Sequence, residues 1–97
     1  MTTIAVAVPP GDILKEELEA RGWSQVAFAE ILGMSPRLVS EIISAKRAIT
    51  PATAKAIGAA FGTSAQVWLN LEAAYQLDKT GHDDAAVSRR ARLYQLA

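Results

Sequence analysis

The sequence predicts an all-α fold that contains a helix-turn-helix unit. Serine and threonine residues precede several segments of helical apolar spacing, and glycines stand where those segments end. Between Gln25 and Ile42, small and apolar residues also fall at the intervals that two steeply crossing helices require. These observations together predict a compact bundle of five helices followed by one more helix at the C-terminus.

The first helix is expected from Asp12, a good N-cap, to Arg21, with Gly22 ending it. Residues 1–10 precede it as an N-terminal arm. A large aromatic residue directly after a helix-ending glycine usually packs on the core, so Trp23 is expected to pack rather than to bind a cofactor. The inward side chains of this helix are expected to be Ile13, Leu14 and Leu18.

The second and third helices form the helix-turn-helix unit. Ser24 caps a helix over residues 25–32, and Ser35 followed by proline opens the next helix. Ala29 is small enough for a close crossing, and Gly33 supplies the positive φ that the turn needs. Two merely packed helices are the alternative, but the outer side of the later helix is polar and a Lys-Arg pair follows it, which favours binding in a DNA groove. The apolar side of the unit comprises Phe28, Leu32, Val39, Ile42 and Ile43.

Two more helices complete the predicted bundle. Thr50 and the proline after it open a helix that runs to about Ala60 and ends at Gly62. Ser64 caps the fifth helix, which leads into a linker at 79–82. The side chains expected to face inward are Ala54, Ile57 and Phe61 on the fourth helix, and Val67, Trp68, Leu71, Ala74 and Tyr75 on the fifth.

A last helix is expected from the acidic pair Asp83-Asp84 to about Leu96, because carboxylates stabilise a helix N-terminus. Its apolar stripe is narrow and lies beside three arginines. The chain thus divides into an N-terminal arm (1–10), a helix-turn-helix domain (11–78), and a linker with a C-terminal helix (79–97). The stripe consists of Val87, Ala91 and Tyr94, and the arginines are Arg89, Arg90 and Arg92.

Composition restricts the class of protein. Ninety-seven residues with 51% hydrophobic content suit one domain with its own core. The chain has no cysteine, which excludes disulfides and thiolate metal sites. No apolar run reaches the roughly 18 residues of a membrane span, and the N-terminus lacks a signal-peptide pattern. We therefore expect a cytoplasmic protein without membrane contact.

The net charge is zero, but the charges are unevenly distributed. Two basic against five acidic residues give residues 1–34 a charge of −3, and four against one give residues 35–62 a charge of +3. Residues 63–97 balance four against four. The positive segment coincides with the predicted groove-binding helix. So modest a field predicts weak non-specific DNA binding by one protomer, and hence a need for a dimer or a partner to reach useful affinity.

The residues disfavour an enzyme or a metal protein. One histidine, no cysteine and acidic residues scattered over solvent-facing helix positions provide no catalytic constellation. His82 beside Asp83-Asp84 is more typical of a capped loop than of a metal site. We expect no catalytic residues, no cofactor and no metal.

Four segments resemble the HigA family of antitoxins. In order between about Pro10 and Leu77 they are Pro-Gly-Asp-Ile-Leu-Lys-Glu-Glu-Leu, Gly-Trp-Ser-Gln, Lys-Arg-Ala-Ile-Thr-Pro and Trp-Leu-Asn-Leu-Glu-Ala-Ala-Tyr. The Trp-Leu-Asn-Leu segment, residues 68–71, points to HigA rather than to other Xre, or Cro/C1-type, repressors. The resemblance implies a five-helix lambda-repressor-like domain plus a C-terminal helix, and a homodimer that represses its own operon. It also implies a HigB-type toxin as partner, a RelE-like ribonuclease that cleaves messenger RNA.

The resemblance further implies how the chain contacts double-stranded operator DNA. Gln25 corresponds to the family's phosphate-contacting glutamine, with simple N-terminal capping as the alternative. Arg37 is expected to read a guanine edge, and Glu41, one turn later, to accept from a cytosine or to orient Arg37, with an ion pair between the two as the alternative. Leu38 would touch a thymine methyl or, equally, pack in the core or a dimer contact.

Lys46 and Arg47 correspond to the family's Gly-Lys-Arg clamp on the DNA backbone, except that Ala45 replaces the glycine. A non-glycine residue is strained at positive φ, so this departure affects the geometry of the clamp. Ser40 and Ser44 are expected to serve phosphates or water. The full set expected to bind DNA is Gln25, Ser35, Arg37, Leu38, Ser40, Glu41, Ser44, Lys46 and Arg47.

The sequence leaves two surfaces and two other functions open. The dimer contact is expected on the fifth or sixth helix. Candidate toxin contacts are the N-terminal arm, the C-terminal tail and the acidic first helix with Glu16, Glu17 and Glu19. A stand-alone Xre-type repressor without a toxin fits the same residues. So does an interaction module that has lost DNA binding.

Overall fold

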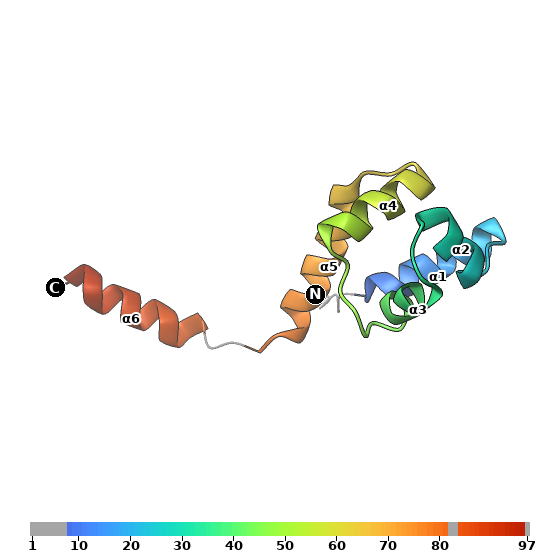
Figure 1. Cartoon of the computed structure of the whole chain (residues 1–97). Coiled ribbons are helices and arrows are strands. Elements are labelled where there is room, and N and C mark those ends of the chain that lie inside the picture. The colour runs from blue at the N-terminus through green and yellow to red at the C-terminus, as the bar shows by residue number, and fades with distance from the viewer. Residues whose placement is uncertain (1–7, 82–83, 97) are drawn as a thin grey trace, which may run out of the picture.

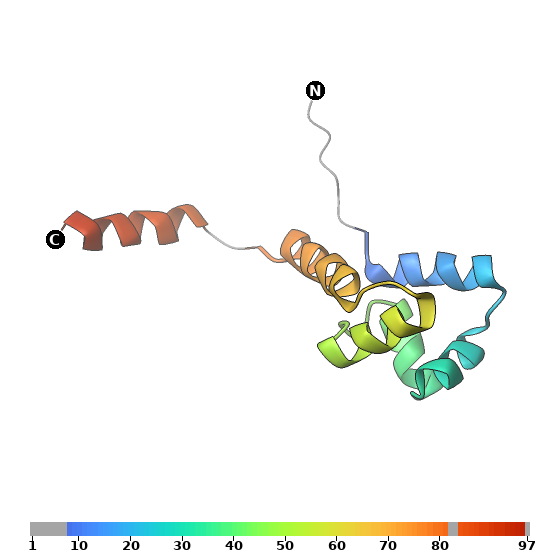
Figure 2. The same ribbon diagram turned by 90° about the horizontal axis from the view of Figure 1, so that it is seen from above.

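The computed structural model describes residues 8–81 and 84–96, and every secondary-structure element in those ranges is a helix (Figure 1). Five helices pack into one body, and α6 lies apart from it in two perpendicular views (Figures 1 and 2). The predicted all-α class, with a helix-turn-helix domain and a C-terminal helix, is confirmed. The helices are α1 (Pro10–Arg21), α2 (Gln25–Leu32), α3 (Pro36–Ile43), α4 (Pro51–Phe61), α5 (Ala65–Lys79) and α6 (Asp84–Leu96).

Local capping residues set most of the helix boundaries, as the sequence predicts. The side-chain oxygens of Ser24, Ser35, Thr50 and Ser64 each accept the backbone N–H three residues ahead. Each such bond satisfies one of the N–H groups that a helix start leaves without a partner. At the other ends, Gly22, Gly33 and Gly62 are left-handed, with φ of 70°, 69° and 73°. A residue with a Cβ adopts that conformation only under strain.

Helix α1 begins two residues before the predicted N-cap. Pro9 is the N-cap residue and Pro10 the first helical residue, while Asp12 lies inside the first turn. Proline suits this position because its φ is already helical and its missing N–H leaves no donor unsatisfied. Asp12 still favours the helix start through its negative charge. The prediction of Asp12 as N-cap is therefore wrong.

The core is built around stacked aromatic rings. Phe28 and Phe61 lie parallel with centroids 5.3 Å apart, and Trp23 stacks on both. The Arg21 guanidinium covers the outer side of this stack, 4.7 Å from the Phe61 centroid. The predicted packing role of Trp23 is confirmed. The buried apolar core comprises Leu14, Leu18, Phe28, Ala29, Val39, Ile42, Ile49, Ala54, Ile57, Phe61 and Trp68.

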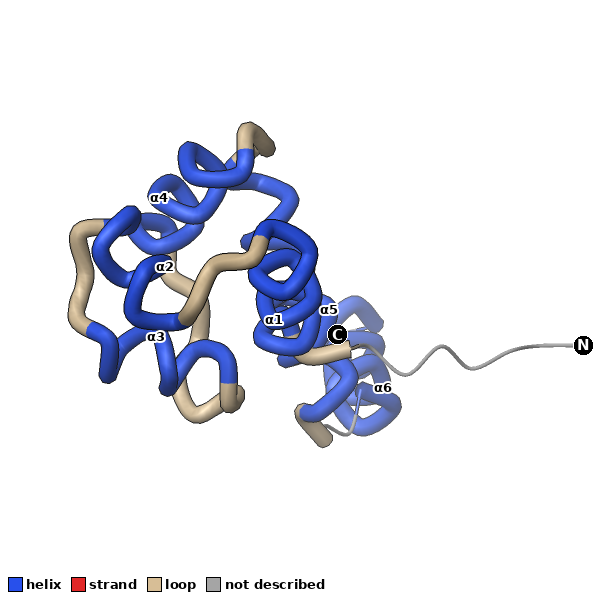
Figure 3. Tube along the Cα trace, turned by 90° about the vertical axis from the view of Figure 1, so that its right-hand side faces the viewer, coloured by secondary structure: helices blue, strands red, loops and turns tan. Residues whose placement is uncertain are grey.

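Helix α3 packs against both α1 and α2 (Figure 3). At the α1 contact, Gly11 lies so close to the C-terminal end of α3 that a Cβ there would stand 2.2 Å from the carbonyl oxygen of Ile43. Glycine therefore permits the approach of the two helices. This contact helps to fix the direction in which α3 points.

The inward side of α5 differs from the prediction at two positions. Trp68 is buried and Leu71 and Tyr75 are half-buried, but Val67 and Ala74 are exposed. Glu72 is buried in their place. Apolar spacing predicted a stripe wider than one side of the helix, whereas α5 is covered where α1, α4 and the loop residue Ile49 contact it. The prediction that Val67 and Ala74 face inward is wrong.

Helix α6 has no buried residue among those described. Val87 and Tyr94, two members of its predicted apolar stripe, are 45% and 85% exposed. The helix starts at Asp84, as the acidic residues there predict. Residues 1–7 of the predicted N-terminal arm, and His82 and Asp83 of the linker, lie outside the described residues.

Candidate nucleic-acid interface

The N-terminus of α2 presents Gln25 to solvent. The capping bond there comes from Ser24, whose hydroxyl oxygen accepts the N–H of Ala27 at 3.0 Å. Gln25 is the first helical residue and is exposed. Its side chain is therefore not the cap of this helix. Backbone N–H groups at such a helix start are suited to an anion.

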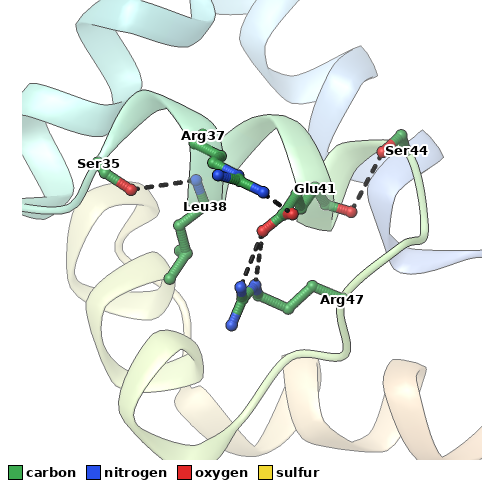
Figure 4. A network of polar contacts seen from close by, with 6 residues as sticks. All are labelled: Ser35, Arg37, Leu38, Glu41, Ser44 and Arg47. Atoms are coloured by element: carbon green, nitrogen blue, oxygen red, sulfur yellow. Dashed lines mark hydrogen bonds and ion pairs between the residues drawn. The ribbon is translucent and has the colours of Figure 1, made fainter.

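The turn between α2 and α3 sets how α3 leaves the core. Ala29 is almost fully buried where the two helices approach, and Gly33 has a φ of 69°. The hydroxyl oxygen of Ser35 accepts the N–H of Leu38 at 3.2 Å (Figure 4). The Ser35 side chain thus serves as the N-cap of α3.

Helix α3 separates a buried side from a polar side. Val39 and Ile42 are buried, and Leu38 is half-buried and packs against the core. Arg37 and Ser40 are exposed, with the Arg37 side chain 87% accessible. The core packing of Leu38 favours the packing alternative over a base contact for this residue. On the polar side, the exposed side chains of Arg37 and Ser40 are accessible to bases and phosphates.

Two arginines converge on the carboxylate of Glu41 (Figure 4). Arg47 donates from Nε and Nη2 to Oε1, at 3.0 and 2.8 Å. Arg37, one turn earlier on α3, lies with Nε 3.6 Å from Oε2. The hydrogen bonds from Arg47 lower the pKa of Glu41, and desolvation opposes this shift while the charges of both arginines add to it. The ion pair expected as the alternative for Arg37 and Glu41 is present, and Arg47 joins it.

The segment after α3 contains the residues that the sequence predicts to clamp the DNA backbone. Ser44 ends the helix, and its hydroxyl donates to the Glu41 carbonyl oxygen at 3.3 Å. Ala45 has a φ of 63°, the one positive φ at a non-glycine residue in the described chain. Ala45 therefore has the left-handed conformation that glycine favours, and its Cβ makes this conformation sterically costly. Lys46 and Arg47 follow, and both are exposed.

Sequence reasoning missed two contacts that hold this segment. One is the bond between Arg47 and Glu41, which spans six residues and the end of a helix. The other joins the backbone N–H of Ile49 to Oε1 of Glu72 at 2.8 Å. The sequence contains a signal for the contact of Glu72. This residue lies four residues after Trp68 and three before Tyr75, and this spacing places all three on the same side of the helix.

The described part of the chain contains no group of three metal-ligating side chains. Within the same residues, none of the helices is both long and apolar enough to cross a membrane. Of the three residues in the metal alternative, His82 and Asp83 lie outside the described ranges, and Asp84 is the first residue of α6.

Comparison with known proteins identifies the family. The helix-turn-helix family model matches residues 14–68. Virulence-associated protein I of Dichelobacter nodosus is 40% identical over 84% of this chain and 77% of its own length. The HTH-type transcriptional regulator YddM of Escherichia coli is 36% identical over 87% of this chain and 88% of its own.

A solved structure extends the likeness to three dimensions. The Pseudomonas aeruginosa antitoxin HigA, solved with the higBA promoter, has a TM-score of 0.71 and 33% identity, covering 93% of this chain and 90% of its own. The family match covers residues 14–68, and the likeness to the solved structure covers 93% of this chain. The chain belongs to the Xre-type helix-turn-helix family, and its fold is that of the DNA-binding HigA antitoxins.

Proposed function

We propose that this protein is an antitoxin that binds its own operator as a homodimer, represses its operon and neutralises an mRNA-cleaving HigB-type toxin. One observation carries the DNA-binding part. The buried Val39 and Ile42 hold α3 in the body, while Arg37 on its outer side and Lys46 and Arg47 just after it remain accessible. This arrangement suits a helix that enters the major groove with a cationic clamp beside it.

In this proposal each part of the site has a separate task. Arg37 reads a base edge, most readily the two acceptors of a guanine. Lys46 and Arg47 contact phosphates, and the backbone N–H groups at the start of α2, beside Gln25, hold another phosphate. Two copies of α3 in a symmetric dimer would enter successive major grooves roughly 34 Å apart. The operator would then be palindromic.

Two uncovered surfaces support protein partners, and the family supports a toxin as one of them. Leu93, Tyr94 and Leu96 of α6 are 67% to 85% exposed and leave apolar surface that a second copy of the chain would cover. Glu16 and Glu19 of α1 are exposed as well, and suit a basic partner. We assign α6 to the dimer and the acidic side of α1 to the toxin.

The first experiment is a fluorescence-anisotropy titration of wild type and Arg37→Ala on the DNA upstream of the gene and on scrambled DNA, across a salt series. We expect tight, salt-sensitive binding of wild type to the upstream DNA. We expect Arg37→Ala to lose about 1–3 kcal/mol of discrimination between the two DNAs. Equal and feeble binding of wild type to both DNAs would contradict the DNA-binding part of the proposal.

A stand-alone repressor is the second candidate, because the E. coli relative is named as a transcriptional regulator. The two functions differ only in the toxin. The DNA next to this gene separates them: the absence of a small reading frame there supports the stand-alone regulator, and where one is present it is expressed alone and together with this gene. Growth arrest that co-expression relieves supports the antitoxin, and a harmless neighbour supports the stand-alone regulator.

A further inference from the structure

Glu41 occupies a central position on the candidate DNA surface. Its carboxylate lies between Arg37 and Arg47, which reach it from opposite sides (Figure 4). Its side chain is only 25% exposed, whereas those of Arg37 and Arg47 are 87% and 51% exposed. A phosphate approaching this surface therefore meets the arginines first and the carboxylate behind them.

The main chain of Glu41 also sets the position of Arg47. Its carbonyl oxygen accepts the N–H groups of Lys46 and Arg47, at 2.8 and 3.2 Å. These bonds turn the chain back along α3 after its last residue. Consequently the Arg47 side chain lies within reach of the Glu41 carboxylate although six residues separate the two.

The ion pairs with Glu41 leave Arg37 more available for DNA contacts than Arg47. Arg47 uses Nε and Nη2, the two donors along one edge of its guanidinium, on the same oxygen of Glu41. A phosphate that takes this edge has to displace the carboxylate. Arg37 is held less tightly, with its Nε 3.6 Å from Oε2 of Glu41 and its side chain 87% exposed.

We propose that Glu41 determines specificity by restraining the arginines, so that DNA without the right bases binds poorly. Non-specific binding comes almost entirely from contacts between cationic side chains and phosphates. On such DNA, releasing Arg47 leaves Oε1 of Glu41 beside phosphates without the two hydrogen bonds that it accepts from Arg47. On the operator, a base-edge donor such as the amino group of a cytosine replaces the arginine. This inference rests on the proposed DNA binding.

The test compares wild type with Glu41→Gln on the upstream DNA and on scrambled DNA. For scrambled DNA we expect the affinity of Glu41→Gln to rise roughly threefold to tenfold, since one or two exposed ion pairs are lost. The salt slope should steepen by about 1, which corresponds to one more phosphate contact. Affinity for the upstream DNA should rise less or fall, so that the specificity ratio decreases.

Two further variants separate restraint from simple charge repulsion. Asp78→Asn removes the same charge from an exposed position on α5 and should leave both affinities within about twofold of wild type. In an Arg47→Ala background, Glu41→Gln should have less than about half of its original effect on the logarithm of the affinity for scrambled DNA, because the restrained arginine is gone. Circular dichroism verifies that each variant is folded.

The outcomes distinguish this inference from the proposed function. If wild type prefers the upstream DNA but Glu41→Gln leaves the specificity ratio unchanged, the role of Glu41 is wrong and DNA binding stands. An undiminished effect in the Arg47→Ala background shows direct repulsion of phosphate and also overturns the inference. If wild type shows no preference for the upstream DNA, both fail.

Discussion

The backbone N–H of Ile49 donates a hydrogen bond of 2.8 Å to Oε1 of Glu72, across 23 residues of sequence. The other carboxylate oxygen of Glu72 accepts from Nε2 of Gln76 at 2.7 Å. Glu72 is only 9% exposed, so both oxygens depend on these protein donors. The contact fixes the end of the segment that carries Lys46 and Arg47, and it connects that segment to α5.

We predict that Glu72→Ala lowers the free energy of unfolding by about 1–3 kcal/mol, because the buried N–H of Ile49 loses its acceptor. Glu72→Gln keeps a carbonyl oxygen and should cost less. Urea denaturation measures both, and Glu19→Ala, at an exposed position on α1, serves as the control. If the free energy of unfolding of Glu72→Ala lies within about 0.5 kcal/mol of wild type, the hydrogen bond between Ile49 and Glu72 contributes nothing to stability.

Ala45→Gly is expected to stabilise the protein. The φ of 63° strains an alanine by about 1–2 kcal/mol, and glycine relieves that strain while adding some entropy to the unfolded chain. The net gain should be about 0.5–1 kcal/mol. Thermal and urea unfolding measure it. Ala48→Gly, in the same segment without a positive φ, should be neutral or destabilising, and equal effects of the two substitutions would argue against strain at Ala45.

Gly11→Ala should destabilise the contact between α1 and α3. The new Cβ would lie 2.2 Å from the carbonyl oxygen of Ile43 and 2.7 Å from that of Ile42, so a helix has to shift. Overpacking of this kind costs about 1–3 kcal/mol. Gly81→Ala adds the same methyl group where nothing lies within 4 Å and is the matched control. Equal unfolding free energies for the two variants would refute the close approach.

The titration of Glu41 provides a test of the ion-pair cluster. Because hydrogen bonds from Arg47 lower the pKa of Glu41 in the folded state, the resulting stabilisation is present above the ordinary pKa of a glutamate. It is lost as the pH falls through the lowered value. Carboxyl-carbon NMR shifts should therefore show the pKa of Glu41 rising in Arg47→Ala. Lys46→Ala removes a neighbouring charge that takes no part in the pair, and a larger rise there than in Arg47→Ala would disprove the assignment.

Local signals in the sequence predict most of the helix boundaries and indicate the chemistry of the candidate site. Ser24, Ser35, Thr50 and Ser64 cap helices in the structure where capping rules predict them, and three glycines end them in the left-handed conformation. These signals are local, since each depends on hydrogen bonds or dihedral angles within a few residues. The positive charge of residues 35–62 is equally a property of the sequence alone.

The packing of the helices determines which groups distant in the sequence meet and which helix faces are covered. Arg47 reaches Glu41 because backbone bonds turn the chain after α3, and Glu72 reaches Ile49 because α5 packs beside the core. Val67 has the spacing of an inward residue but is exposed, since no neighbouring helix covers it. Apolar periodicity shows which residues favour burial, whereas burial itself requires a second element at that surface. That requirement depends on how all five helices pack together, and no local segment of the chain contains it.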